Sequence, residues 1–399
     1  MSEADRRIVV VGAGAGGLRA AEGLRAAGFT GELTVFGAEP HLPYYRPPLS
    51  KRALVEGVSD EVVALRRRKS AADIDWRTGR EVAAADLAAR KVRLADGEVA
   101  EYDGLVVATG LRALRLPLPG GPRGRHVLRT RDDAAALRAE LAPGARVVVV
   151  GAGFVGTEVA ASAVESGCEV TVLDLVEVPL LRQLGPELGA AMRRRHEARG
   201  VRFALGRTLE ALHGADGRLR SVELDDGTLL PADVLVEAVG SRPNVEWLTG
   251  NGLDLGDGVL CDNALRVGGR DEVVAVGDVA RFPNPLFGGP PRRVEHWNMA
   301  PDTAKRAART LAAAVAGEPV PDEPFRPVPS FWSDQYDLNL QSFGSPELGM
   351  ADVRVLDGDP DGEVVVGYHR EGVLVGVVLI GFADRYREFR TRIAAGGAG

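Results

Sequence analysis

The residues best suited to chemistry are two triads of glycine, each placed where a short apolar run gives way to a predicted helix. Both follow the pattern G-x-G-x-x-G, with Gly12, Gly14 and Gly17 in the first triad and Gly151, Gly153 and Gly156 in the second. The first glycine of this pattern makes a tight turn, the second lets backbone approach a pyrophosphate, and the third lets helix pack on strand. One match is weak evidence, because glycine-rich turns are common. Two on one chain predict two dinucleotide cofactors.

A carboxylate near the end of the following strand is the usual partner of the adenosine ribose. Glu39 is the nearest such acid after the first triad, and a solvated loop acid is its alternative. Asp174 ends the strand predicted at 169–173, where its carboxylate would accept bonds from a ribose 2′-hydroxyl and repel a 2′-phosphate. This favours NADH over NADPH. Arg182 lies shortly after and is a residue type that accommodates the phosphate, so NADPH stays open.

Two cations and one acid also stand near the triads. Arg46 and Lys51 flank RPPLSK, whose prolines hold the chain extended and in which Ser50 is predicted to cap a short helix carrying Lys51. Cations fixed in this way suit an anionic cofactor, and the alternative is a pair of surface charges beside a turn. Glu158 follows Gly156 in the predicted first helical turn, close to the cofactor's phosphate end. An acid in a first turn is also simply favourable for a helix.

Further strand ends carry small or polar residues. LVVATG at 105–110, which contains Thr109, is matched by VLVEAVG at 234–240, so the two halves look like versions of one layout. VVAVGDVA at 273–280 places Asp278 at the carboxyl end of a buried strand, where it suits the hydroxyls of a ribityl chain; a plain turn is the alternative. RRVEHWNMA at 292–300 then leads into an alanine-rich helix, whose N-terminus would stabilise negative charge on a reduced flavin ring.

The hydrophobic pattern supplies the elements that position these residues. A strand at 7–11, a helix at about 16–27 and a strand at 32–36 make a βαβ opening, and a second such unit runs from about 113 to 240. The C-terminal part reads as strands at 337–343, 352–356, 363–369 and 373–380, closed by a basic helix at 385–392. The arginines of that helix suit an acidic protein partner or a merely solvated face; they are Arg385, Arg387, Arg390 and Arg392. The basic run at 66–69 is predicted to be a solvated face.

Composition narrows the class of protein. The chain has 399 residues, enough for two or three domains, and its net charge of -7 argues against general nucleic-acid binding. It contains no apolar run long enough to span a membrane and no signal-like leader. Its two cysteines, Cys168 and Cys261, form no CxxC, no disulfide framework and no metal-binding spacing, so we expect packing roles and a cytoplasmic location.

Taken together, the motifs resemble one family. Four separated stretches carry the likeness: the first triad with ATG at 108–110, RPPLSK at 46–51, the second triad with Glu158, and GD at 277–278. FWSDQYDLNLQSFG at 331–344 is the most discriminating, because it resembles a small interface domain that disulfide reductases generally lack. The chain therefore resembles the FAD-dependent NADH:ferredoxin reductases of oxygenase systems, the putidaredoxin reductase-like family that is related to apoptosis-inducing factor.

The resemblance implies an α/β fold with two Rossmann-like dinucleotide-binding domains and a small α+β C-terminal domain. An FAD domain would comprise 1–112 and 241–323, with an NAD domain at 113–240 inserted in it, and an interface domain would span 324–399. Lys51 and Glu158 resemble the ion pair beside the flavin's reactive edge. The other implied FAD contacts are Gly12, Gly14, Gly17, Glu39, Arg46, Thr109, Asp278, Glu295, Trp297 and Trp332. The implied NADH contacts are Gly151, Gly153, Gly156 and Asp174. One departure from the family pattern is Ala38, where related chains usually have an acid, so the ribose contact falls to Glu39.

The activity that the resemblance implies is hydride transfer from NADH to FAD, followed by single-electron transfer to an iron–sulfur ferredoxin. That ferredoxin would be of the [2Fe–2S] type and would feed a monooxygenase or dioxygenase. We expect no nucleic-acid or membrane partner, no metal site, and a monomer or homodimer. Because no cysteine precedes Cys168, no thiol relay is available and electrons must leave from the flavin. The alternatives are an NADH oxidase or quinone-type flavoprotein, an NADH-responsive binding flavoprotein, and a biosynthetic flavoenzyme.

Overall fold

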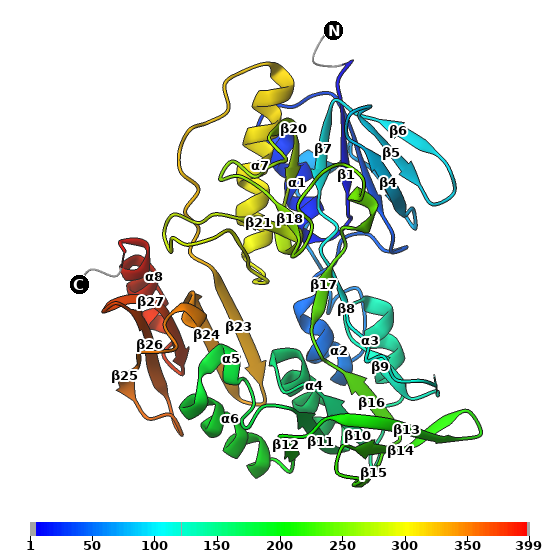
Figure 1. Cartoon of the computed structure of the whole chain (residues 1–399), viewed down its shortest axis with the longest axis vertical. Coiled ribbons are helices and arrows are strands. Elements are labelled where there is room, and N and C mark those ends of the chain that lie inside the picture. Colours follow the sequence, from blue (N-terminus) through cyan, green and yellow to red (C-terminus); the bar gives the residue numbers. More distant parts are fainter. Residues whose placement is uncertain (1–4, 121, 397–399) are drawn as a thin grey trace. The chain divides into compact units, whose positions relative to one another are not determined.

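The computed structural model describes residues 5–120 and 122–396, which fall into two compact units (Figure 1). The first unit is drawn from Met1–Tyr45, Leu65–Arg112 and Arg242–Ser330, and the second from Arg46–Ala64, Ala113–Ser241 and Phe331–Gly399. The chain passes between the units after Tyr45, Ala64, Arg112, Ser241 and Ser330. The crossings after Arg112 and Ser241 fall within strands β8 (Leu111–Ala113) and β17 (Ser241–Pro243). Residues 113–241 and 331–399 thus share one unit. The division into an FAD, an NAD and a C-terminal domain stays a prediction.

The first unit is built on a six-stranded sheet in the order β19-β20-β7-β1-β2-β3. Neighbouring strands are parallel, apart from the antiparallel pair β19-β20. The apolar runs of β1 and β7 are buried almost throughout, as expected for parallel strands covered on both faces. The strands are β1 (Arg7–Val11), β2 (Glu32–Gly37), β3 (Asp75–Thr78), β7 (Gly104–Val107), β19 (Arg266–Val267) and β20 (Arg270–Ala275).

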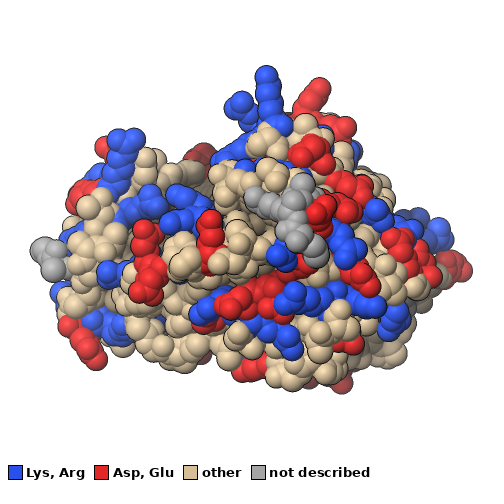
Figure 2. Space-filling model, turned by 90° about the horizontal axis from the view of Figure 1, so that it is seen from above, with Lys and Arg blue, Asp and Glu red and all other residues tan. Residues whose placement is uncertain are grey.

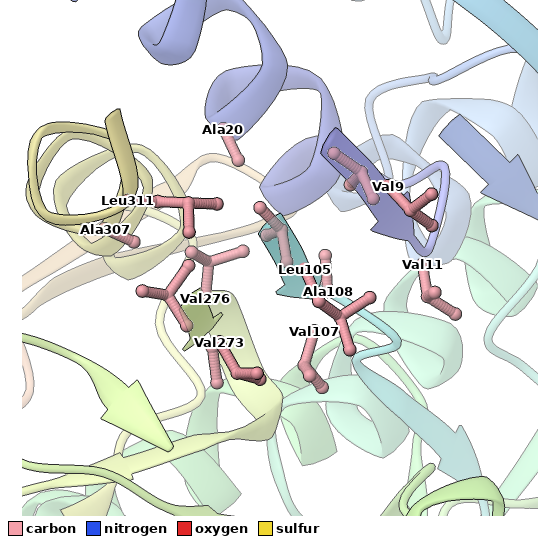
Figure 3. Close-up of a cluster of buried hydrophobic side chains, with 14 of the residues drawn as sticks. Val9, Val11, Ala20, Leu105, Val107, Ala108, Val273, Val276, Ala307 and Leu311 are labelled. Atoms are coloured by element: carbon pink, nitrogen blue, oxygen red, sulfur yellow. The ribbon is translucent and has the colours of Figure 1, made fainter. Parts of the chain in front are cut away.

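Two helices, α1 (Ala15–Ala26) and α7 (Met299–Ala316), pack against this sheet and against each other. Their contact is close, because a Cβ at Gly23 would lie only 2.8 Å from the Cβ of Ala308. Figure 3 shows side chains of β1, β7 and β20, such as Val9, Leu105 and Val273, with Ala20 of α1 above them and Leu311 of α7 to their left. This core fixes the carboxyl ends of the central strands, which all open on the same edge of the sheet.

Two small sheets complete the first unit. One consists of β4 (Val82–Asp86), β5 (Lys91–Leu94) and β6 (Val99–Glu101), and the other of β18 (Val259–Leu260), β21 (Ala280–Phe282) and β22 (Arg292–Arg293). The turn between β5 and β6 has Gly97 at φ +94°, a backbone conformation that favours glycine.

The second unit contains a five-stranded parallel sheet in the order β12-β11-β10-β16-β9. Its strands are β9 (Arg125–Val127), β10 (Arg146–Val150), β11 (Glu169–Asp174), β12 (Arg202–Leu205) and β16 (Val234–Glu237). The accompanying helices are α2 (Arg52–Val55), α3 (Arg131–Arg138), α4 (Phe154–Glu165), α5 (Leu181–Leu184) and α6 (Pro186–Ala198). A small antiparallel sheet is formed by β13 (Leu209–Ala215), β14 (Arg218–Leu224) and β15 (Leu229–Pro231).

The C-terminal part of the same unit is a five-stranded sheet in the order β23-β24-β27-β26-β25, followed by a helix. These elements are β23 (Ser330–Gln335), β24 (Leu338–Gly344), β25 (Val353–Gly358), β26 (Val364–Arg370), β27 (Val373–Ile380) and α8 (Tyr386–Ala394). The sheet shares a hydrophobic core with α5 and α6, in which Leu184, Met192 and Tyr368 are buried. The Tyr368 hydroxyl donates to the carbonyl of Leu184 at 2.8 Å. The C-terminal sheet is therefore integral to the second unit.

The prediction of an α/β chain with two strand-turn-helix openings is confirmed. Two local predictions are wrong. Ser50 does not cap a helix, because Pro47–Ser50 is itself a 3-10 turn and Lys51 precedes α2. Glu158 does not lie in the first turn of α4, because that helix begins at Phe154. Favourable interaction with the helix N-terminus therefore does not explain Glu158.

Lys and Arg side chains alternate with Asp and Glu side chains on the face shown in Figure 2. This agrees with a sequence that contains 49 basic and 56 acidic residues, where the net charge is small compared with either total. No single sign of charge dominates that face.

Candidate functional site

The first glycine triad forms a turn that requires glycine at two of its three positions. Gly12 has φ +116°, and a Cβ there would lie 2.1 Å from the carbonyl oxygen of Ala108. A Cβ at Gly17 would lie 1.9 Å from the carbonyl oxygen of Gly12. Gly14, in contrast, has no heavy atom within 4 Å of its Cβ position. Gly12 and Gly17 thus close the turn, and Gly14 between them faces open space where a pyrophosphate fits.

The second triad repeats this geometry. Gly151 has φ +108°, and its Cβ would lie 2.2 Å from the carbonyl oxygen of Ala238. A Cβ at Gly156 would lie 1.8 Å from the carbonyl oxygen of Gly151, whereas Gly153 meets nothing closer than the Gln183 Nε2 at 3.9 Å. This cradle also fits the pyrophosphate of a dinucleotide.

The helices that follow the triads leave their N-termini available to an anion. Neither α1 nor α4 has a side chain capping its first turn, and neither carries an acid there. Both are 12 residues long, so each presents a partial positive charge at this end. Backbone N–H groups in this position are suited to phosphate oxygens.

The two acids predicted to bind a ribose, Asp174 and Glu39, have different hydrogen-bond partners. Asp174 ends β11, and its carboxylate accepts bonds from the N–H of Ala152 at 2.6 Å and of Val176 at 3.2 Å. It therefore lies beside the second glycine turn. Glu39 comes two residues after β2 and accepts a bond from the Tyr44 hydroxyl at 2.6 Å.

Two more predicted residues follow central strands of the first unit. Thr109 follows β7 and Asp278 follows β20, and these strands are parallel neighbours beside β1. Both residues thus lie at the same sheet edge as the first triad, as predicted for a ligand site. The Thr109 hydroxyl already donates to the carbonyl of Asn244 at 2.6 Å. Asp278 follows Gly277, whose φ of +71° is a backbone conformation that favours glycine.

Glu295 and Trp297 lie just before α7. Glu295 pairs with Arg293 at 2.6 Å, and the ring of Trp297 meets that of Tyr45 edge-on with 4.8 Å between centroids. Trp297 also lines an open cavity of about 630 Å³ together with Ala15 at the start of α1 and the basic run 66–69. The side chains of that run are exposed, as predicted.

The second unit brings together Lys51 and Glu158, which are far apart in sequence. The Lys51 Nζ lies 2.8 Å from the Glu158 Oε2, with side-chain exposures of 15% and 6%. The same oxygen accepts a bond from the Ser50 hydroxyl at 2.5 Å, and the ammonium also donates to the Pro47 carbonyl at 3.2 Å. This is a buried, hydrogen-bonded ion pair that places one cation in a fixed position.

Arg46 and Trp332 also belong to the second unit. Arg46 donates to the carbonyl of Arg129 at 2.7 Å, which ties the RPPLSK segment to the residues before α3. Trp332 is partly buried on β23. Their contacts with a cofactor stay predictions.

Several buried polar residues were missed by sequence reasoning. The Ser333 hydroxyl donates to the Glu158 Oε1 at 2.6 Å, and the only sequence signal was a polar residue at an inward position of a strand. Glu237, within the apolar run of β16, is buried and pairs with Arg125 at 2.9 Å. Glu22 of α1 is buried and accepts bonds from Arg19 at 2.7 Å and from the Arg68 N–H at 2.6 Å. No local pattern marks either acid.

Both cysteines are buried free thiols. Burial raises the pKa of Cys168, and it raises that of Cys261 further. A raised pKa disfavours the nucleophilic thiolate, which supports packing roles.

Within residues 5–120 and 122–396, no helix combines the length and the apolar character that crossing a membrane requires. The same residues contain no cluster of three His, Cys, Asp or Glu side chains suited to a metal ion.

Comparison with known proteins identifies the two parts of the chain. Residues 6–304 match the family described as pyridine nucleotide-disulphide oxidoreductase, and residues 330–398 match the family described as reductase C-terminal. Among solved structures, putidaredoxin reductase in its covalent complex with putidaredoxin matches with a TM-score of 0.91 and 31% identity, over 98% of this chain and 94% of that one. These matches confirm the predicted resemblance and fold.

Two similar proteins are named as reductases. The ferredoxin–NAD(+) reductase component of the anthranilate 1,2-dioxygenase system from Burkholderia cepacia is 38% identical over 396 residues, covering 97% of this chain and 94% of that protein. Rhodocoxin reductase from Rhodococcus erythropolis is 37% identical over 360 residues, covering 90% of this chain and 82% of that protein.

Proposed function

Because the chain belongs to the pyridine nucleotide-disulphide oxidoreductase family, we propose that it is an FAD-dependent NADH:ferredoxin oxidoreductase serving an oxygenase. Relatives named as ferredoxin reductase components, alike over nearly the full length, support this assignment. The observation that carries it is the buried Lys51–Glu158 pair, which holds a cation without any reactive thiol nearby in sequence. Such a site provides electrostatic placement and leaves the redox chemistry to a cofactor.

Two sets of residues would hold the two cofactors. In the first unit, the first triad, Glu39, Thr109, Asp278, Glu295 and Trp297 would bind FAD. The second triad and Asp174 would bind NADH. When bound, FAD supplies the redox chemistry by accepting a hydride from NADH and giving up electrons singly to an iron–sulfur ferredoxin.

The role of Lys51 is to present positive charge in a fixed position. Glu158 and the Pro47 carbonyl both accept bonds from its ammonium, so the side chain cannot turn away without breaking them. A preorganised cation of this kind stabilises developing negative charge without reorganising. Glu158 fixes the position of the ammonium.

Asp174 would set the preference for NADH. Its carboxylate lies beside the second glycine turn, where it would accept bonds from a ribose 2′-hydroxyl and repel a 2′-phosphate.

The ferredoxin partner would be an acidic protein, and α8 is one candidate docking element. Arg387 and Arg390 are exposed on it, whereas Arg385 precedes the helix and pairs with Glu388 at 2.9 Å and with Asp357 at 2.8 Å. Arg392 is only partly exposed. Docking at α8 would therefore depend on Arg387 and Arg390, and its rate would fall with added salt.

A cytoplasmic location follows from the same proposal. Both cysteines persist as buried free thiols, which suits a reducing compartment. Fractionation of cells that express the tagged chain tests this location.

The function is tested by anaerobic stopped-flow reduction with NADH or NADPH, followed by mixing with a ferredoxin and cytochrome c. We expect rapid flavin bleaching by NADH and cytochrome reduction that requires the ferredoxin. Fast bleaching with every ferredoxin inert would favour a small-molecule acceptor such as oxygen or a quinone. Slow bleaching into a long-lived complex with NAD would favour a binding protein.

A further inference from the structure

Strand β23 turns two polar side chains into the interior of the second unit. Ser333 is fully buried and Gln335 is 2% exposed, while Asp334 between them faces solvent. Burying a hydroxyl and an amide is unfavourable unless each finds hydrogen-bond partners. The inward face of this strand is therefore informative, because apolar residues would fill a core at less cost.

The partners of these side chains form a continuous chain of hydrogen bonds that ends on the ion pair. The Gln335 Nε2 donates to the Ser333 Oγ at 3.0 Å and to the Thr157 Oγ1 at 3.1 Å. Ser333 in turn donates to the Glu158 Oε1 at 2.6 Å. At the other end, the Gln335 Oε1 lies 2.7 Å from the His196 Nε2.

The direction of this chain is fixed by its members. An amide oxygen only accepts, so the His196 Nε2 must carry the proton and donate it to Gln335. The His196 Nδ1 then accepts from the Tyr336 hydroxyl at 3.3 Å. Burial lowers the pKa of His196 and raises the pKa of Tyr336 to about 12, which keeps the imidazole neutral and the phenol protonated. The single hydroxyl proton of Ser333 is thereby directed at Glu158.

We propose that Ser333 and Gln335 are positioning residues that hold the Glu158 carboxylate toward Lys51, and that the C-terminal segment thus sets the placement of this cation. The proposal rests on the proposed role of Lys51. Glu158 is held at both oxygens: Ser333 binds Oε1, whereas Ser50 and Lys51 bind Oε2. Removing the Ser333 hydroxyl leaves Oε1 without this donor, and the carboxylate can rotate away from the ammonium.

The first test compares Ser333→Ala with a matched control. Ser342 is equally buried on the neighbouring strand β24, and its hydroxyl has no hydrogen-bond partner among the described residues, so Ser342→Ala removes a hydroxyl that holds nothing. In the holoenzyme at a fixed ambient potential, we expect Ser333→Ala to lower the ratio of reduced to oxidised FAD about threefold to tenfold. Ser342→Ala and the hydroxyl-retaining Ser333→Thr should stay within about twofold of wild type.

Gln335→Glu tests the direction of the chain without removing a partner. A carboxylate accepts from both His196 and Ser333, which turns the Ser333 proton away from Glu158. We expect the same fall in the FAD ratio as in Ser333→Ala. This variant also carries the test if Ser333→Ala fails to fold.

A second readout is independent of the flavin. In holoenzyme labelled with 15N-histidine, we expect the NMR signals of His196 to show a neutral ring with a slowly exchanging proton on Nε2. A proton on Nδ1 instead would overturn the proposal, whatever the FAD ratio does.

Lys51→Ala separates this proposal from the one on which it rests. If Lys51→Ala lowers the FAD ratio while Ser333→Ala behaves like Ser342→Ala, the positioning role is wrong and Lys51 keeps its own. If Lys51→Ala changes neither the FAD ratio nor the rate of reduction by NADH, the role of Lys51 itself is wrong, and the positioning role falls with it.

Discussion

The two glycine turns share one backbone and differ in their side chains. Gly12 and Gly151 each donate at 2.8 Å to a carbonyl of the next strand, that of Phe36 in one turn and Leu173 in the other. A Cβ added to the third glycine of each triad would lie 1.9 Å or 1.8 Å from the carbonyl oxygen of the first glycine. The equivalence extends from strand through turn to helix. The function proposed for both turns, binding a pyrophosphate, depends on the backbone alone.

The differences begin where the second strand ends. Pairing of the strands makes Gly37 the counterpart of Asp174. A Cβ at Gly37 would lie 2.5 Å from the Cβ of Ala13, whereas Asp174 reaches the N–H of Ala152, the counterpart of Ala13. Two residues past the third glycine, the first helix carries Arg19 and the second carries Glu158. Arg19 pairs within its own helix, and Glu158 holds Lys51. The side chains thus distinguish two otherwise equal turns.

The largest effect is expected from filling the shared backbone contact. Gly17→Ala and Gly156→Ala each place a Cβ less than 2 Å from a carbonyl oxygen, which costs about 3 kcal/mol or more if the turn must open. We expect Gly17→Ala to lose FAD and Gly156→Ala to keep FAD but lose NADH binding. Flavin absorbance after purification and NADH titration measure the two outcomes.

Gly14→Ala and Gly153→Ala are the matched controls, because their Cβ positions are open. They should fold normally and weaken only the cofactor of their own turn. Loss of FAD from Gly156→Ala at normal stability would contradict the assignment of one cofactor to each turn.

The next effect concerns the residues two positions past the triads. Glu158→Gln keeps the shape of the side chain but removes the charge that faces Lys51, so we expect flavin reduction by NADH to slow about tenfold or more. Arg19→Gln, at the equivalent place in the first turn, should change the rate less than about twofold, since Arg19 pairs with Glu22 of its own helix and the Arg68 N–H still donates to that carboxylate. Stopped-flow reduction under anaerobic conditions gives both rates. Equal slowing in the two variants would mean that the charge of Glu158, like that of Arg19, affects flavin reduction only through the structure of its helix.

Much of this comparison could be predicted from the sequence, because glycine spacing and apolar runs are local. The strands β1 and β10 and the helices α1 and α4 follow directly from such patterns, and the acid at Asp174 follows from its place at a strand end. The equivalence of Gly37 and Asp174 could be recognised only from the pairing of the strands. No single segment of the sequence specifies that pairing.

The ion pair shows what local patterns miss. Lys51 and Glu158 were paired by family resemblance, and the hydroxyls of Ser50 and Ser333 that complete the site come from two further segments. The prediction that Ser50 caps a helix was wrong because Pro47–Ser50 is itself a 3-10 turn, and the Ser50 hydroxyl donates to a distant acceptor, Glu158. Contacts of this kind depend on how distant segments pack, so the local sequence around each partner does not predict them.

Asp174→Ala is expected to have a moderate effect. Removing the carboxylate would remove the proposed bonds to a ribose 2′-hydroxyl and the proposed repulsion of a 2′-phosphate, so the preference for NADH over NADPH should fall about tenfold to a hundredfold. Steady-state kcat/KM with both nucleotides measures it. Changing the acid predicted to bind the other ribose, Glu39→Gln, should leave this preference untouched and weaken FAD retention only slightly. Unchanged discrimination in Asp174→Ala would shift the selection to another residue, such as Arg182.

The smallest effect concerns one buried histidine in each unit. Burial lowers the pKa of His296 to about 4, from 6.5 for an ordinary histidine, so the unfolded chain takes up this proton first as the pH falls. The stability that comes from keeping this ring neutral is present above pH 6.5 and is lost as the pH falls from 6.5 to 4; at pH 5.5 the loss relative to pH 7.5 is on the order of 1 kcal/mol. His196 has a lowered pKa as well, but its hydrogen bond with Gln335 opposes burial, so the second unit should lose less. Urea unfolding of the holoenzyme at the two pH values, repeated for His296→Gln and His196→Gln, measures how much each histidine contributes to the loss of unfolding free energy. His296→Gln should remove most of the acid-dependent loss, and a loss as large as that of wild type would show that His296 is protonated in the folded protein at pH 5.5.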